Sequence, residues 1–414
     1  MQQQTFKDAI LNRRTLICVF TGFTSGLPLY FLIQLVPYWL AKEGVGLAEI
    51  GFFSLIGLPY TWKFLWAPVM DRYTLPFLGR RRGWMLVTQV AVAISIAAMG
   101  FFRPEFSIWS IAFMAAAVAF FSASQDVVLD AYRRELLPEI ELGLGNAVHV
   151  QAYRIAGLVP GSLALILSDH LLWHETFIVV AAFMAVGIIL TLNIAEPDRH
   201  PAAPRTMKAA IIDPFKEFIG RTGMDQALLV LAFLFLYKLG DNMATALQTP
   251  FYESLGFSGT EIGVVAKFAS LVAVIAGGAV GGLVMVKLSI NRALWLFGFV
   301  QIISILGFAA LAEIGHNLWM LGAATGFEYL GVGLGSAALV AFMAKSTNPA
   351  FAATQFALFS ALVAVPRTIA NSVTGVIVEQ VGWTNFFLLC TVLAIPGMLL
   401  LIKVAPWNEE LVND

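Results

Sequence analysis

The chain has 414 residues, of which 59% are hydrophobic and only 12% are charged. Soluble domains carry about 25% charged residues, so this composition excludes an ordinary soluble protein and indicates an integral membrane protein. The net charge of −1 says nothing about partners. We expect no nucleic-acid partner, and the two cysteines lie in apolar runs that suggest no disulfide framework.

Apolar segments long enough to cross a bilayer recur along the whole chain. A spanning helix needs about 20 mostly apolar residues. Twelve segments meet this length: residues 15–41, 48–70, 84–102, 107–131, 144–168, 172–194, 226–252, 259–286, 293–312, 317–343, 352–380 and 383–404. Residues 1–7 are too polar for a signal peptide, so the first apolar run is expected to remain as a helix.

Positive charges divide the predicted loops into two groups. Of the 25 lysines and arginines, 18 fall in the termini and loops on one side, and only Lys42 and Arg103 fall on the other. Cytoplasmic loops carry the excess of Lys and Arg, so both termini are expected in the cytoplasm and the number of spans is even. We predict a six-helix bundle over residues 1–194, a cytoplasmic linker over 195–225 and a second six-helix bundle over 226–414.

The two predicted bundles repeat each other at an offset of 210 to 215 residues. Gly51 aligns with Gly263, and Arg154 aligns with Arg367. Six helices followed by six similar helices in the same orientation indicate an all-α transporter built from parallel repeats. In such folds the substrate site lies between the repeats near the bilayer midplane.

Residues 58–84 are predicted to form a cytoplasmic hairpin between the second and third spans. The hairpin enters water at Asp71 and Arg72, turns, and continues through Arg80, Arg81 and Arg82. The cluster of arginines places this loop on the cytoplasmic side. We expect the hairpin to control the conformational cycle without contacting cargo.

Charged residues inside the predicted spans are the candidates for functional sites. A charge at the bilayer centre costs at least ~2.5 kcal/mol, so each one needs a partner or a purpose. Five cations and four acids fall there: Lys63, Arg154, Lys238, Lys267 and Arg367, with Asp126, Asp130, Asp241 and Glu328.

The two arginines of this set, Arg154 and Arg367, occupy matching places in the fifth and eleventh spans. A guanidinium offers a fork of donors suited to carboxylate or phosphate. We therefore predict a clamp for an anionic small molecule. The alternative is that each arginine is neutralised by a neighbouring acid such as Asp126 or Glu328, and the excess of one cation favours the clamp.

Lys238 and Asp241 are three residues apart and are predicted to share one face of the seventh span. They are either a self-satisfied ion pair or part of the substrate site. An ion pair that opens when an anion binds would serve both purposes.

Asp126, Asp130 and Arg134 follow one line along the fourth span. Asp130 is expected to pair with Arg133, Arg134 or the hairpin arginines, in a structural role at the inner gate. Asp126 lies deeper, and desolvation disfavours the charged form of a carboxylate. Asp126 is therefore the first candidate for proton coupling and Glu328 the second, with a purely structural role as the alternative for each.

Short motifs spread over nearly the whole chain resemble the AmpG muropeptide permeases of the major facilitator superfamily. They are Ser25-Gly26-Leu27-Pro28, Gly51-Phe52-Phe53-Ser54-Leu55, Lys63-Phe64-Leu65-Trp66-Ala67-Pro68, Asp71-Arg72-Tyr73, Gly79-Arg80-Arg81-Arg82-Gly83-Trp84, Ser124-Gln125-Asp126, Asp130-Ala131, Tyr237-Lys238-Leu239-Gly240-Asp241, Phe327-Glu328 and Ala353-Thr354-Gln355-Phe356-Ala357-Leu358. Lys63 and Gln125 belong to these motifs and are expected among the cargo-binding residues.

This resemblance implies proton-driven import of N-acetylglucosaminyl-anhydromuramyl peptides from periplasm to cytoplasm, for peptidoglycan recycling. It also implies a monomer in the inner membrane of a Gram-negative bacterium, driven by the proton motive force and needing no cofactor. Ferric-siderophore permeases of the pyochelin and rhizobactin type are an alternative within the same family.

A polytopic membrane acyltransferase is the alternative from another class of protein. Such an enzyme should bring a catalytic His, Cys or Ser to the membrane midplane. The five histidines instead lie near span ends or in loops, and no metal-ligand spacing appears. We therefore expect neither an enzyme nor a metal site.

Overall fold

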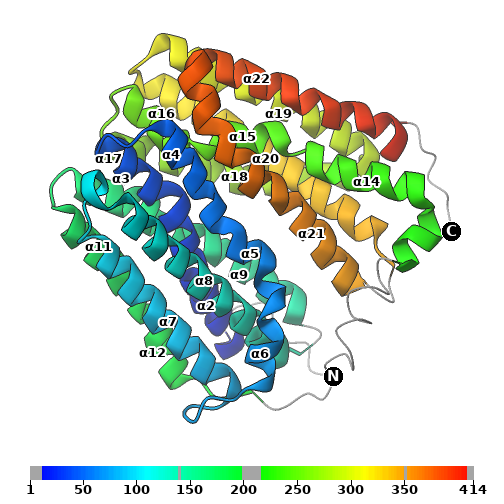
Figure 1. Ribbon diagram of the computed structural model, residues 1–414. Coiled ribbons are helices and arrows are strands. Elements are labelled where there is room, and N and C mark those ends of the chain that lie inside the picture. The colour runs from blue at the N-terminus through cyan, green and yellow to red at the C-terminus, as the bar shows by residue number, and fades with distance from the viewer. Residues whose placement is uncertain (1–11, 139–140, 198–215, 349–351, 408–414) are drawn as a thin grey trace. The chain divides into compact units, whose positions relative to one another are not determined.

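The computed structural model describes residues 12–138, 141–197, 216–348 and 352–407, and all regular elements within these residues are helices (Figure 1). They fall into two compact units. The first is drawn from Met1–Val45, Leu55–Pro201 and Ser258–Val264, and the second from Gly46–Ser54, Ala202–Phe257 and Val265–Asp414. Each unit therefore includes one short segment that is distant in sequence from the rest of that unit.

The first unit contains most of the helices that precede residue 200. They are α2 (Arg13–Tyr30), η1 (Phe31–Leu35), α3 (Val36–Lys42), α5 (Leu58–Trp62), η3 (Lys63–Leu65), α6 (Ala67–Arg72), α7 (Arg80–Met99), α8 (Pro104–Leu136), α9 (Leu142–Ala156), η5 (Val159–Leu163), α10 (Ala164–Ser168), α11 (Trp173–Ala182), α12 (Ala185–Asn193) and the short α17 (Gly259–Glu261). Within it α2 packs on α9, and α7 packs on α8, α11 and α12.

The second unit is built around four long helices. Its elements are α4 (Leu47–Phe52), α14 (Met224–Leu236), α15 (Leu239–Ala246), α16 (Gln248–Ser254), α18 (Lys267–Met285), α19 (Ile290–Ile314), α20 (Leu318–Ser346), α21 (Ala352–Ile369), η8 (Ala370–Val373) and α22 (Thr374–Val404). Two further elements, η2 (Phe53–Gly57) and η6 (Ile262–Ala266), cross the unit boundaries. Helix α20 packs on both α18 and α19, and α19 packs on α22.

Glycines allow α18 and α20 to approach closely. A Cβ atom on Gly333 would lie 2.5 Å from the Val274 carbonyl oxygen, and one on Gly277 would lie 2.5 Å from that of Leu330. Small residues at such crossings let helix backbones touch where the solvent is lipid. Gly277 and Gly333 therefore serve the packing of α18 against α20.

Ten helical segments of the described chain are long and apolar enough to cross a membrane. The predicted span at 48–70 is not among them, because it is divided into α4, η2, α5, η3 and α6. Pro59 and Pro68 are the second residues of α5 and α6, and proline cannot donate the backbone hydrogen bond that would continue a preceding helix. The last two predicted spans join into one long segment, Leu362–Val404, broken at Gly382, whose φ of 77° disfavours other residues.

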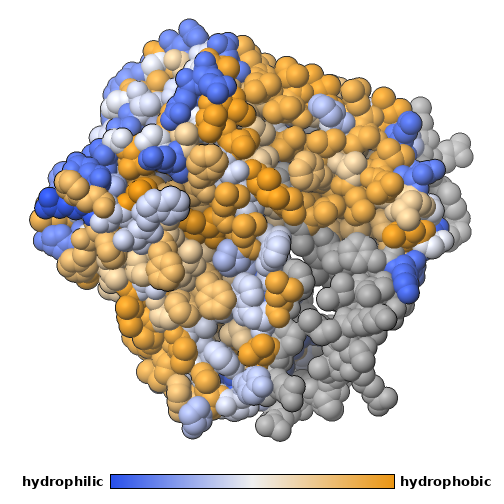
Figure 2. Space-filling view, viewed as in Figure 1, coloured by the Kyte–Doolittle hydropathy of each residue, from blue (hydrophilic) through white to orange (hydrophobic). Residues whose placement is uncertain are grey.

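Apolar side chains cover most of the visible surface, as Figure 2 shows. Large examples occur in both units: the exposed fractions are 71% for Phe113, 72% for Leu283 and 91% for Trp319. Soluble monomers rarely expose apolar surface on this scale. With the ten apolar segments, this surface identifies a multi-pass membrane protein.

Candidate functional site

A first polar cluster in the first unit joins α2, η3 and α8. Ser25 donates a hydrogen bond to Asp126 at 2.5 Å, and Lys63 Nζ lies 3.8 Å from an Asp126 oxygen and 4.0 Å from an Asp130 oxygen. Arg133 pairs with Asp130 at 2.9 Å. We call Ser25, Lys63, Asp126, Asp130 and Arg133 the first cluster.

The first cluster is electrically balanced. Two cations, Lys63 and Arg133, face two carboxylates, so no proton is needed to neutralise it. Of the partners predicted for Asp130, Arg133 is the one it contacts within the described residues, and its structural role at the inner gate stays a prediction. Lys63 is partly exposed at 32% of its side chain, which leaves its ammonium within reach of a solute.

A second polar cluster lies in the second unit, between α15, α19 and α20. Lys238 Nζ is 2.7 Å from Asp241 Oδ2, and the two side chains are only 7% and 6% exposed. Glu328 is fully buried, accepts a hydrogen bond from Ser304 at 2.7 Å, and has the Asp241 carboxyl as its neighbour. We call Lys238, Asp241, Ser304 and Glu328 the second cluster.

The second cluster has one more acid than cations. The ion pair predicted from the spacing of Lys238 and Asp241 is confirmed, but Glu328 adds a second carboxyl to the same buried group. Uncompensated charge inside a membrane is costly. One proton bound by the cluster would make it neutral, whereas the first cluster needs none.

The two arginines of the predicted clamp lie in different units. Arg154 is partly exposed and Arg367 is exposed. Within the part of the chain that the structure describes, neither makes an ion pair: Asp126 is engaged by Lys63, and Glu328 by Ser304. Both guanidiniums are therefore accessible, and the clamp for an anionic small molecule stays a prediction.

Gln125, next to Asp126 on α8, is fully buried. Its Nε2 donates to the Thr24 carbonyl oxygen at 3.0 Å, which ties α8 to α2. A hydrogen bond from Trp66 Nε1 to Ser124 at 2.9 Å adds a second tie, between the segment preceding α6 and α8. Contact of Gln125 with cargo stays a prediction.

The arginine hairpin is held by acids that follow it in sequence. Arg80 and Arg81 both pair with Glu135 at the end of α8, at 2.8 and 2.7 Å. Arg82 donates to the carbonyl oxygens at the end of α12, and the amides of Arg81 and Arg82 donate to Glu196. The side chains of Asp71 and Arg72 lie outside the described residues, and that of Arg134 is exposed.

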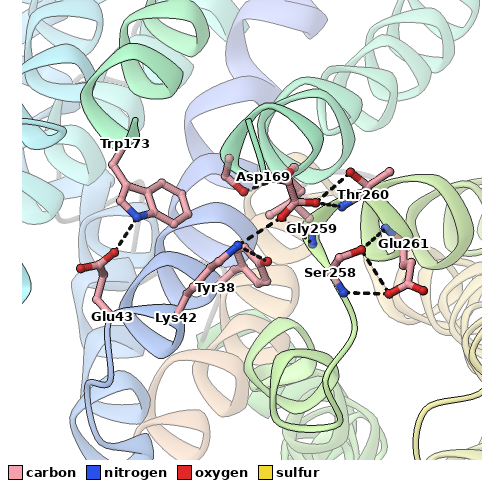
Figure 3. A network of polar contacts seen from close by, with 11 residues as sticks. Tyr38, Lys42, Glu43, Asp169, Trp173, Ser258, Gly259, Thr260 and Glu261 are labelled. Atoms are coloured by element: carbon pink, nitrogen blue, oxygen red, sulfur yellow. Dashed lines mark hydrogen bonds and ion pairs between the residues drawn. The ribbon is translucent and has the colours of Figure 1, made fainter. Parts of the chain in front are cut away.

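Asp169, which the sequence analysis did not single out, caps a helix start that is 90 residues away (Figure 3). Its two carboxylate oxygens accept hydrogen bonds from the Gly259 amide at 3.2 Å, the Thr260 amide at 2.6 Å and the Thr260 hydroxyl at 2.8 Å. Lys42 adds an ion pair at 3.1 Å. Burial opposes the charged form of Asp169, but the bonds from Thr260 and Lys42 outweigh it and lower the pKa of this carboxyl.

The second unit contains a matching cap. Glu379 accepts a hydrogen bond from the Ala48 amide at the start of α4, at 2.9 Å. Asp169 and Glu379 are 210 residues apart, the offset that relates the two repeats. That offset is the sequence signal that could have identified both acids.

No group of His, Cys, Asp or Glu side chains suited to a metal ion occurs among the residues that the structure places. The side chains of the two clusters, with Gln125 and the two arginines, supply carboxylates, cations, hydroxyls and an amide. These groups can bind anions and protons.

Comparison with known proteins gives consistent matches over nearly the whole chain. The sequence profile of the Major Facilitator Superfamily matches residues 18–371. The chain is 48% identical to an uncharacterized protein of Haemophilus influenzae, covering 98% of both chains. It is 44% identical to the anhydromuropeptide permease of Escherichia coli K12, over 94% of this chain and 79% of that protein.

Solved structures show the same fold. A crystal structure of a nucleoside transporter aligns with a TM-score of 0.76 at 14% sequence identity, covering 95% of this chain and all of the other. The D-xylose–proton symporter aligns with a TM-score of 0.75 at 11% identity.

Proposed function

The chain belongs to the major facilitator superfamily, and on that premise we propose that it imports anhydromuropeptides across the inner membrane, driven by protons. The observation that carries this proposal is the 44% identity to the Escherichia coli anhydromuropeptide permease over 94% of the chain. Because this family consists of transporters, its match argues against the alternative of a membrane acyltransferase. The cargo would enter the cytoplasm for peptidoglycan recycling, through a monomer that needs no cofactor.

The accessible guanidiniums support a role in cargo binding. Anhydromuropeptides carry peptide carboxylates, and a guanidinium binds a carboxylate through two parallel hydrogen bonds. Arg154 and Arg367 are free of ion pairs to described acids, so neither must first be released. Lys63 and Gln125 are secondary candidates, and the closed Lys238–Asp241 pair would have to open to contribute.

The charge excess of the second cluster supports a role in proton coupling. A carrier must alternate between a protonated and an ionised state, which a guanidinium cannot do. Glu328 and Asp241 share one lysine, so binding and release of a single proton switches the cluster between neutral and negative. Glu328 is therefore a stronger candidate for the proton carrier than Asp126, because Asp126 belongs to the balanced first cluster.

We propose that the hairpin from Asp71 to Arg82, with Asp130 and Arg134, controls closure on the cytoplasmic side. In this proposal, the contacts of Arg80 and Arg81 with Glu135 hold in one conformational state of the transport cycle and weaken in another. No cargo contact is required of this group.

The proposal is tested by uptake of a labelled N-acetylglucosaminyl-anhydromuramyl peptide. The chain is expressed in a Gram-negative strain whose own permease gene is deleted and which therefore releases anhydromuropeptides into the medium. Restored uptake and a loss of release are expected, with dependence on the pH gradient shown by an uncoupler. A well-expressed protein that restores neither, or that carries a ferric siderophore instead, would contradict the cargo assignment.

A further inference from the structure

A small cavity lies beside the second cluster, between α15, α19 and α22. Its walls are mostly apolar, with Ile302, Ile305 and Met398 among them. Three side chains with polar groups also line it, Tyr237, Asp241 and Gln301. The space open to the centre of a water molecule is about 10 Å³, roughly what one water molecule requires and no more.

Gln301 is the residue of this cavity whose buried amide lacks hydrogen-bond partners among the described residues. It is only 4% exposed, and neither its Nε2 nor its Oε1 has a hydrogen-bond partner among the described residues. The amide is held in place by α20, since a Cβ on Gly335 would lie 2.3 Å from Oε1. A buried amide with both groups unpaired is rare in proteins, because its desolvation is then uncompensated.

The neighbouring carboxylates have free acceptor atoms. Asp241 Oδ2 is taken by Lys238, and the Asp241 and Glu328 carboxyls interact with each other, whereas no donor from another described residue reaches Asp241 Oδ1 or Glu328 Oε1. The other polar group of the cavity, the Tyr237 hydroxyl, already donates to the Leu294 carbonyl oxygen at 2.9 Å. The cavity therefore offers one donor, Gln301 Nε2, and at least two acceptors.

We propose that Gln301 binds a water molecule in this cavity, next to Asp241, and that this water passes the transported proton to and from the second cluster. Water can accept one hydrogen bond from Nε2 and donate to Asp241 Oδ1 and Gln301 Oε1, which satisfies all three atoms. A proton arriving as hydronium transfers to the carboxylate, leaving neutral water and a carboxylic acid, and release reverses this step. The role in coupling rests on the proposed function, but the water site does not.

Gln89 provides a matched control. It lies 212 residues before Gln301, in α7 of the first unit, and it is also fully buried. Its Oε1 accepts a hydrogen bond from Thr191 at 2.9 Å, whereas its Nε2 has no partner among the described residues, so Gln89 differs from Gln301 in having its carbonyl satisfied. Gln89→Leu removes a buried glutamine without touching the second cluster.

The water site is tested by infrared spectroscopy of the purified full chain in lipid, in H₂¹⁶O and in H₂¹⁸O. A buried-water O–H band that shifts with ¹⁸O is expected in the wild type and in Gln89→Leu, and is expected to be absent in Gln301→Leu. Gln301→Asn keeps an amide and leaves room for a second water, so the band should persist. A spectrum of Gln301→Leu that matches the wild type would overturn the site.

The role in coupling is tested in proteoliposomes loaded with anhydromuropeptide. Gln301→Leu should lower uptake driven by a pH gradient about tenfold, the effect of losing one hydrogen bond, while counterflow exchange changes less than about twofold. Gln301→Asn should recover most of the loss. Gly335→Ala, which displaces the amide, should resemble Gln301→Leu.

The outcomes separate this inference from the proposed function. If the wild type carries no anhydromuropeptide, the proposed function fails, and the infrared result still decides the water site. If the wild type is proton-coupled but Gln301→Leu matches Gln89→Leu in both assays, the role of the water is wrong.

Discussion

Removing the carboxylate of Asp169 should release the segment at residues 258–264 from the first unit. Both oxygens of Asp169 are in use: one accepts from the Gly259 amide and Lys42, and the other accepts twice from Thr260. Asp169→Ala removes all of these bonds. Asp169→Asn keeps one acceptor oxygen but turns the other into an NH₂ group that faces a donor, so it should be nearly as damaging.

The magnitude follows from the contacts. Loss of a helix-capping side chain costs about 0.5–2 kcal/mol, and each net hydrogen bond contributes about 1 kcal/mol. The ion pair to Lys42 adds less than about 1 kcal/mol, because the lysine side chain is 37% exposed. We expect a local loss of about 2–3 kcal/mol, which is about 30-fold or more in the opening equilibrium of this segment.

Amide hydrogen exchange of the protein in lipid nanodiscs measures this directly. Protection of the amides at 258–264 should fall about 30-fold in Asp169→Ala, while protection in α19 and α20 stays unchanged. Glu105→Gln is the control, since Glu105 is an exposed acid at the start of α8. Unchanged protection at 258–264 in a folded Asp169→Ala protein would refute the capping argument.

The remaining predictions concern the candidate sites. Arg367→Ala and Arg154→Ala should each weaken cargo binding tenfold or more in an equilibrium binding assay, because a charge-assisted bond is worth about 1.5–3 kcal/mol; wild-type affinity would disprove the clamp. Glu328→Gln should abolish accumulation driven by a pH gradient but keep counterflow, and Asp126→Asn should be the milder variant; the reverse order would restore Asp126 as the carrier. Glu135→Ala should lower the free energy of unfolding by about 2–4 kcal/mol, since two arginines lose their partner; a denaturant titration showing less than about 0.5 kcal/mol would contradict this. The stabilisation by Asp169 should vary with pH: its folded pKa is lowered, so the contribution is present above the unfolded value of about 3.9 and is lost as pH falls through the folded pKa, which hydrogen exchange below pH 5 can follow.

Local patterns in the sequence predicted local contacts well. Lys238 with Asp241 and Asp130 with Arg133 are each three residues apart on one helix, so their pairing follows from helix geometry alone. Helix-breaking residues also indicated where one predicted span ends and the next begins. The glycine at 382 separates the last two predicted spans where the structure breaks α22.

Contacts between distant segments were not predictable in the same way. Glu135 lies more than 50 residues from the arginines that it pairs with, and Ser304 lies 24 residues from Glu328. Hydropathy assigns each of these residues to a helix, but it does not give the rotation of that helix, which decides which side chains meet. The division of the second span into short pieces was missed for another reason, because its apolar length was sufficient while its prolines interrupt the backbone bonding.

The repeat itself explains why the two clusters can differ in function. Duplicated halves give each residue a counterpart at a nearly constant offset, as Asp169 has Glu379 and Gln89 has Gln301. Where both copies keep the same partners, as the two helix caps do, the shared role is structural. Where the partners diverge, one copy is free to take a new role. Gln89 has Thr191 as its partner, whereas Gln301 faces a cavity beside a carboxylate pair that one lysine cannot neutralise. The search for coupling residues in such proteins should therefore begin at positions where a buried polar residue has a side-chain partner in one repeat and none among the described residues in the other.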